Sequence, residues 1–86
     1  MEDWQQLFID EMGGMIDVLL YHRGSGCYFP LYTPDKDEAS IRLKWVESEI
    51  IPVMINYKLY LKLDCSEPVY YDDDMYYVKL IQISKN

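Results

Sequence analysis

The sequence predicts an α+β fold, a single small two-layer domain in which helices pack on an antiparallel sheet. Two observations predict the sheet: residues 55–64 alternate apolar and polar side chains without a break, and residues 75–84 form a second β-rich run. A third predicts the helices, because residues 2–12 and 34–49 carry apolar side chains at helical spacing. The expected element order is α-β-β-α-β-β.

The length of the chain allows one domain. It has 86 residues, half of them hydrophobic, and no repeat or low-complexity segment divides it, so we expect residues 1–86 to fold together. No apolar run approaches the roughly 20 residues that cross a bilayer, and the acidic start Met1-Glu2-Asp3 lacks a signal-peptide pattern. A cytoplasmic location is therefore expected.

The first predicted helix spans Glu2 to Met12. Its acidic first turn suits the helix dipole, and Gly13-Gly14 is expected to end it. The apolar residues that recur on one face are Trp4, Leu7, Phe8 and Met12.

A hairpin is predicted next. Ile16, Val18 and Leu20 share one face of a strand from Met15 to His22, and Cys27 to Thr33 returns as a second strand. The polar, glycine-rich residues 23–26 form the turn between them. Pro30 cannot donate to a ladder, which predicts an edge position or a bulge.

The second helix is predicted from Pro34 to about Glu49. Thr33 can cap it and Pro34 suits its first position. Residues 41–45 also alternate as a strand would, so a strand is the alternative for this segment. Pro52 is expected to end the element in either case.

The closing hairpin joins residues 55–64 to residues 75–84 through residues 65–74. The later strand is apolar on both faces, which predicts a place inside the sheet, covered by helices on at least one side.

Charge is spread unevenly along the chain. Fifteen acidic and eight basic residues give a formal net charge of −7, and residues 1–22 and 64–77 contain no lysine or arginine. Such a field repels nucleic acid and anionic lipid, and it speeds encounter with basic surfaces. We therefore expect a protein partner with a basic surface, no direct nucleic-acid binding and no membrane binding.

The stretch that follows the first strand of the closing hairpin is the candidate binding site. It combines carboxylates with tyrosines, which are enriched in protein interfaces because they bury large area at low entropic cost. Adjacent tyrosines point to opposite faces of a strand, so one of each pair is expected to be partly exposed. The predicted partner-binding residues are Asp64, Glu67, Tyr70, Tyr71, Asp72, Asp73, Asp74 and Tyr76.

No catalytic, metal or cofactor motif accompanies this site. His22 is the single histidine, and nothing in the sequence supplies a nucleophile beside it. The three consecutive aspartates lack the alternating ligands and central glycine of an EF-hand, so a solvated turn is favoured over a metal site. Cys27 and Cys65 are expected to be free thiols, with one disulfide as the alternative.

These features predict a small, non-catalytic binding protein that docks on and inhibits a basic protein, and the class of protein expected is one that handles nucleic acid. In charge, size and compactness the chain is similar to inhibitors of phages and mobile elements: anti-restriction, anti-CRISPR or glycosylase-blocking proteins, some of which mimic DNA. For such a viral protein the location would be the host cytoplasm. The alternative is an assembly subunit, for example a homodimer, that self-associates through an aromatic sheet surface.

Replacing Asp72, Asp73 and Asp74 together with lysine tests the acidic site. Reversal of the local charge is expected to weaken partner binding with little loss of stability, because exposed loop charges contribute little to folding. Affinity can be measured by calorimetry and folding by thermal denaturation; unchanged affinity would contradict the proposed role of these residues.

Overall fold

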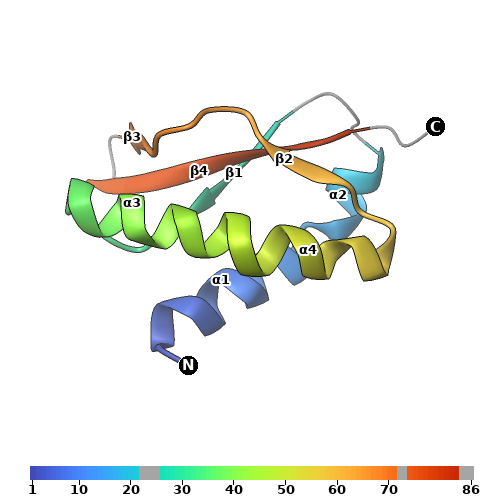
Figure 1. Ribbon diagram of the computed structural model, residues 1–86, viewed down its shortest axis with the longest axis horizontal. Coiled ribbons are helices and arrows are strands. Elements are labelled where there is room, and N and C mark those ends of the chain that lie inside the picture. The colour runs from blue at the N-terminus through green and yellow to red at the C-terminus, as the bar shows by residue number, and fades with distance from the viewer. Residues whose placement is uncertain (22–25, 72–73, 84–86) are drawn as a thin grey trace.

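The structure is a computed structural model that describes residues 1–21, 26–71 and 74–83 (Figure 1). Its elements, in chain order, are the helices α1 (Asp3–Gly14) and α2 (Ile16–Tyr21), strand β1 (Cys27–Pro30), helix α3 (Lys36–Trp45), the π-helical turn η1 (Val46–Ile50), helix α4 (Ile51–Met54), the 3₁₀ turn η2 (Ile55–Tyr57), and strands β2 (Leu61–Leu63), β3 (Val69–Tyr71) and β4 (Met75–Gln82).

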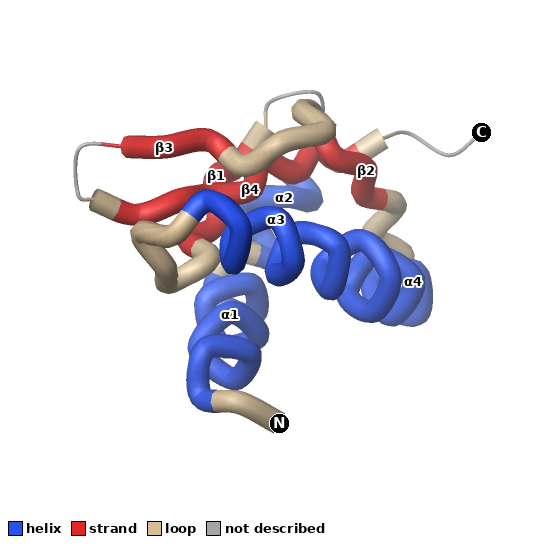
Figure 2. The backbone as a smooth tube through the Cα atoms, turned by 60° about the vertical axis from the view of Figure 1, so that its left-hand side comes forward, coloured by secondary structure: helices blue, strands red, loops and turns tan. Residues whose placement is uncertain are grey.

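The predicted α+β class and the antiparallel sheet are confirmed. All strand pairs described are antiparallel, and α1, α3 and α4 lie on one side of the sheet (Figures 1 and 2). The predicted order α-β-β-α-β-β is wrong in two places, because the second element is a helix and the closing segment contains three strands instead of two.

Helix α1 confirms the first predicted helix, with an end two residues later than expected. The backbone N–H of Glu2 donates to the Gln5 side chain at 2.7 Å, which closes the N-terminal turn. Phe8 and Met12 are buried, as the apolar spacing predicted. Gly13 and Gly14 belong to the helix, and the break comes after them, at Met15.

The predicted strand from Met15 to His22 is wrong, because Ile16–Tyr21 forms helix α2. The backbone N–H of Leu19 donates to the carbonyl of Met15 at 2.9 Å, and Leu19 is fully buried. Met12, Met15 and Leu19 recur at helical spacing, a pattern that competed with the alternation read from the same stretch. Residues 22–25, which hold most of the predicted turn and His22, lie outside the described residues.

The predicted helix from Pro34 is confirmed, and the helical run continues from Lys36 to Met54. Asp35, rather than Thr33, is the cap: its side chain accepts from the backbone N–H of Glu38 at 2.9 Å. Thr33 acts one step earlier, since its hydroxyl accepts from the N–H of Asp35 at 3.1 Å. Helix α3 therefore has one side-chain cap, Asp35, and Thr33 fixes the turn that leads into it.

Pro52 does not end the helical run, contrary to prediction. The π-helical turn η1 precedes it, and the N–H of Ile51 donates to the carbonyl of Val46, five residues back. Pro52 then occupies the first turn of α4, where a missing N–H is tolerated. The wider turn thus lets the helix pass through a proline.

Strand β4 is the centre of the sheet, as predicted for an internal strand. It pairs with β1 along one edge and with β2 and β3 in succession along the other. The predicted hairpin between Cys27–Thr33 and Met15–His22 is therefore absent, and β1 pairs with β4 instead. β1 is an edge strand, which confirms the expectation for Pro30.

The strand predicted over residues 55–64 is confirmed only at its end. Ile55–Tyr57 forms a 3₁₀ turn, and Lys58 closes it in the left-handed conformation with φ 61°. Strand β2 begins at Leu61. The alternation of side chains persists from Leu59 onward, with Leu59 and Leu61 buried.

The core lies between the sheet and the helical layer. Its members share near-complete burial: Phe8, Met12, Leu19, Phe29, Leu31, Ala39, Leu43, Val46, Ile50, Leu59, Leu61, Val78 and Leu80. Gln82 is buried among them, and its side chain accepts from the backbone N–H of Tyr60 at 3.0 Å, which satisfies a polar group that burial would otherwise destabilise.

Substituting Phe8 tests this core. The ring is fully buried and packs on Phe29 and Trp45, with both centroid separations at 5.8 Å. Phe8→Ala is expected to lower the free energy of unfolding in urea by about 3–5 kcal/mol. Leu7→Ala is the matched control, because the neighbouring Leu7 is half-exposed and its loss is expected to cost about 0.5 kcal/mol or less. Equal effects of the two substitutions would contradict this packing.

Candidate functional site

The sheet face opposite α1, α3 and α4 carries tyrosines (Figures 1 and 2). Residues paired directly across a sheet share a face, so the pair Tyr28–Lys79 of β1 and β4 and the pair Val69–Tyr77 of β3 and β4 point the same way. Val78 and Leu80, which alternate with them on β4, are buried beneath the helices.

Three of these tyrosines form a connected cluster, which we call the tyrosine patch: Tyr28, Tyr71 and Tyr77. The ring of Tyr71 meets the ring of Tyr28 edge-on at 5.1 Å and that of Tyr77 at 5.1 Å. Edge-to-face contacts of this kind stabilise a fixed arrangement of rings. Tyr28 is 41% exposed and Tyr71 38%, so the patch keeps aromatic surface in contact with water.

Lys79 ties the tyrosine patch to Asp64. Its ammonium lies 5.4 Å from the centroid of the Tyr28 ring and 3.0 Å from a carboxylate oxygen of Asp64. A Cβ added at Gly26 would overlap the Lys79 side chain, so the stem of the lysine is confined on that side. The hydrogen bond and charge of Asp64 raise the pKa of Lys79 above 10.5.

The end of the β3–β4 hairpin holds a second pair of rings on the opposite face. Tyr70 and Tyr76 are directly paired, with centroids 5.0 Å apart. The Tyr70 hydroxyl donates to Asp74 at 2.9 Å, and the N–H of Asp74 donates to the carbonyl of Tyr71. Asp74 adopts a positive φ of 61°, a conformation that aspartate tolerates in turns.

The structure therefore divides the predicted binding residues. Tyr70, Tyr71, Asp74 and Tyr76 come together at one hairpin, and adjacent tyrosines take opposite faces, as expected. Asp64 lies on the side of the patch but is paired with Lys79. Asp72 and Asp73 lie outside the described residues.

Glu67 is separated from this group. It lies at a cleft between α3 and the connector from β2 to β3, a cleft that Lys44 and Glu47 also line. Of the predicted acidic site residues that the structure describes, Asp74 lies at the hairpin end, Asp64 is paired with Lys79, and Glu67 lines a separate cleft.

Tyr28, Tyr77 and Lys79 were missed as site residues. Tyr28 and Lys79 face each other only because β1 pairs with β4, whereas the sequence favoured pairing of β1 with residues 15–22. Tyr77 belongs to the adjacent pair Tyr76-Tyr77. Because neighbouring residues of a strand point to opposite faces, this pair indicated that one of its rings lies on the outer face of the sheet.

The described part of the chain contains no disulfide, no candidate metal site and no helix that could span a membrane. Cys27 and Cys65 are free thiols, as expected, and burial raises the pKa of Cys27. Among the described residues, no three His, Cys, Asp or Glu side chains gather where a metal ion could bind. No helix within the described ranges has the length and apolar character to span a membrane.

Comparison with known proteins gives no relative: no protein-family model, curated protein or solved structure matches the chain. The functional argument therefore rests on the geometry of the chain itself.

The tyrosine patch predicts a specific alkaline titration. Hydrogen bonding to Tyr28, and secondarily burial, raises the pKa of Tyr71 above 10.0, while Lys79 acts in the opposite direction. A raised pKa in the fold means that stability from Tyr71 and Lys79 is complete below about pH 10. It is lost as the pH rises through the raised values.

Tyr28→Phe is expected to bring the pKa of Tyr71 back toward 10.0, because the hydroxyl that raises it is gone. Ring resonances of Tyr71 followed by NMR across the alkaline range provide the measurement. Tyr57→Phe, an exposed tyrosine outside the patch, is the control. A Tyr71 titration that Tyr28→Phe leaves unmoved would contradict this ring geometry.

Proposed function

We propose that this chain is a small, non-catalytic binding protein that docks on a basic surface of another protein through the tyrosine patch and the adjoining β3–β4 hairpin end. The single observation that carries the proposal is the cluster of Tyr28, Tyr71 and Tyr77 on the sheet face opposite α1, α3 and α4, where the rings of Tyr28 and Tyr71 are exposed.

The shape of the patch supports docking on a protein. Its rings come from β1, β3 and β4, so the sheet fixes their spacing before a partner arrives. Rings that are ordered in advance lose little entropy on binding, which favours affinity. Tyrosine also leaves a hydroxyl for hydrogen bonds at the rim of an interface.

Charge supports a basic partner, through a smaller set of the acidic residues that the sequence predicted, because Asp64 is paired with Lys79. Lys79 neutralises Asp64, and Lys62 adds a second cation on the same face through its pairing with Ile81. The acidic character therefore concentrates at the hairpin end, where Asp74 follows Asp72 and Asp73 in the sequence. The net charge of −7 adds long-range attraction to a basic partner.

The acidic charge of the chain favours a partner that handles nucleic acid, and binding would inhibit that partner. A basic surface that binds phosphates would also bind this hairpin end, and occupation of that surface would exclude nucleic acid. The alternative is self-association through the same patch, since the uncovered aromatic face is also suited to a second copy.

Affinity capture with a salt series tests the proposal. The chain is immobilised, a basic protein retained from the lysate of the source cell at low salt is purified, and its dissociation constant is measured by calorimetry. Tyr28→Ala with Tyr71→Ala is expected to weaken binding about tenfold or more. Ile41→Ala is the control, because Ile41 is exposed on α3 away from the patch.

Three results would contradict the proposal. The double tyrosine variant could bind the partner as tightly as the original chain. The affinity could be insensitive to salt, or the partner could keep its nucleic acid when the chain is bound. A dimer that persists at high salt in sedimentation and that the double variant dissociates would support self-association instead.

A further inference from the structure

An apolar groove of about 430 Å³ lies between α1 and the segment from Trp45 to Tyr57, which contains η1, α4 and η2. Ile9 and Ile16 contribute to one wall, and Trp45, Val53, Met54 and Tyr57 contribute to the other. Both walls belong to helices that lie on one side of the sheet (Figure 2), whereas the tyrosine patch lies on its opposite face.

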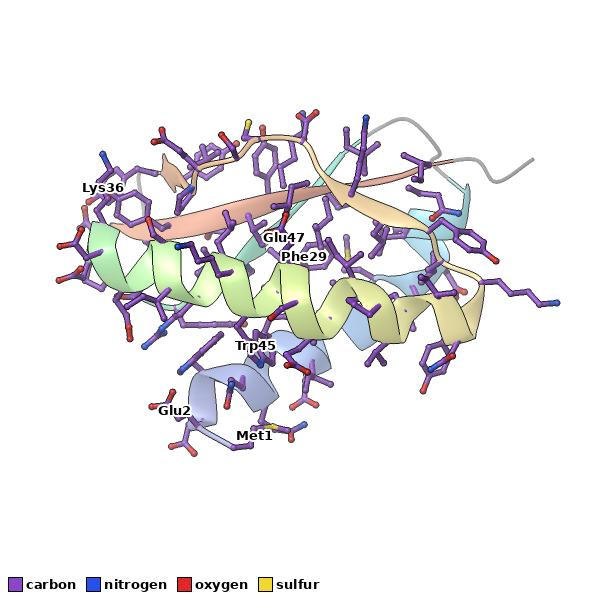
Figure 3. The ribbon with its side chains drawn as sticks, in the orientation of Figure 1. Met1, Glu2, Phe29, Lys36, Trp45 and Glu47 are labelled. Atoms are coloured by element: carbon purple, nitrogen blue, oxygen red, sulfur yellow. The ribbon has the colours of Figure 1, made fainter. Side chains whose placement is uncertain are left out.

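Beside the groove, α1 is joined to the segment that carries Trp45 by aromatic and cationic contacts. Trp45 points from the helical run toward α1 (Figure 3), where its ring meets Trp4 edge-on at 4.9 Å. Arg42 stacks on Trp4 at 4.5 Å and donates to the carbonyls of Leu31 and Tyr32 at 2.8 and 3.0 Å. These contacts join α1 to α3 at one end and leave the walls apart beyond it.

The apolar walls are open to water. Val53 is 46% exposed and Tyr57 60%, although both line the groove. A small molecule between the walls would leave their outer edges in water, whereas the side of a helix would cover them along their length. The methionines of both walls can adapt to the side chains of such a helix.

The π-helical turn gives one wall its straight edge. Trp45, Glu49, Val53 and Tyr57 line the groove at intervals of four residues. In a regular α-helix, residues four apart drift around the axis, and the wider turn η1 offsets that drift. The edge from Trp45 to Tyr57 is therefore about 18 Å long at the usual helical rise, which matches about three turns of a bound helix.

The acidic residues around the groove favour a positively charged binding partner. Glu49 is the one charged side chain in the lining, and the segments 1–21 and 45–57 that supply the walls contain no lysine or arginine. Besides Glu49, they contain acidic residues in and just before the helices α1 and α2: Glu2, Asp3, Asp10, Glu11 and Asp17. A second copy of this chain would bring these acids against each other, which disfavours a dimer through this groove.

We propose that the groove binds an amphipathic helix of a partner protein, with apolar side chains entering between α1 and α4 and lysine or arginine side chains along the edges. Helices with apolar anchors at i, i+3 or i+4 and i+7 dock in this way. This site is separate from the tyrosine patch, so each can be present without the other.

A synthetic peptide tests the groove directly. The probe is a fluorescent leucine–lysine peptide of about 15 residues, patterned as an amphipathic helix; a leucine–glutamate peptide of the same pattern and a scrambled leucine–lysine peptide are the comparisons. Binding is measured by fluorescence anisotropy, and its location by NMR shifts of the indole N–H of Trp45. We expect the patterned lysine peptide to bind and to move the Trp45 signal.

Two pairs of variants separate the groove from the rest of the surface. Val53→Asp is expected to weaken the lysine peptide about tenfold, whereas Ile41→Asp, at an exposed site outside the groove, leaves it unchanged. Glu49→Lys is expected to weaken binding about threefold at low salt and less at high salt. Its control is Glu47→Lys, because Glu47 points away from α1 (Figure 3) and lines a different cleft.

Several outcomes would overturn the proposal. They are absence of binding by the patterned lysine peptide, equal binding of the glutamate or scrambled peptide, unchanged affinity in Val53→Asp, or a dimer that Val53→Asp dissociates. Because Tyr28→Ala with Tyr71→Ala leaves the groove intact, loss of partner binding in that variant alone bears on the tyrosine patch and not on this site.

Discussion

The pairing of β4 with every other described strand is the constraint on which the rest of the structure depends. Its two edges hold β1 on one side and β2 and β3 on the other. Its two faces have different roles, because Val78 and Leu80 enter the core while Tyr77 and Lys79 face away from it. The core and the tyrosine patch are therefore fixed by one strand, and disruption of β4 would remove both.

The helical layer depends on a smaller set of contacts. Trp45 packs on Trp4 and Phe8, and Arg42 joins the ring of Trp4 to two backbone carbonyls that precede α3. These aromatic and cationic contacts position α1 without a long interface between the helices. They leave apolar side chains such as Val53 and Tyr57 exposed along the groove.

Patterns within short stretches of the sequence predicted the elements whose formation depends on neighbouring residues. The spacing of Phe8 and Met12 identified α1, the capping residues before Lys36 identified the start of α3, and the apolar character of both faces identified β4 as internal. The strand prediction for residues 15–21 was wrong because their apolar side chains fit both a period of two and a helical period. Burial of Leu19 in the core favours the helix. The prediction that Pro52 ends the helix was wrong because a π-helical turn precedes this residue and places it in the first turn of α4, where the missing N–H is tolerated.

The candidate site was predictable only in part, because strand pairing is not encoded locally. The hairpin residues Tyr70, Tyr71 and Tyr76 were found from composition, since they are neighbours in the chain. Tyr28 and Lys79 meet through β1–β4 pairing between distant segments, and the ion pair of Lys79 with Asp64 depends on that meeting. A charge pattern in a sequence thus identifies acidic segments, whereas the pairing of strands decides which carboxylates remain free.

The position of β4 in the chain has a consequence for synthesis. β1, β2 and β3 all precede it, and β4 is the strand with which each of them pairs. On the ribosome, a nascent chain can form α1 and α3 early, but its sheet has no template until residues 75–82 emerge. Until then the apolar side of the helical layer is uncovered, so the nascent chain is exposed to chaperones and to aggregation for as long as β4 is missing.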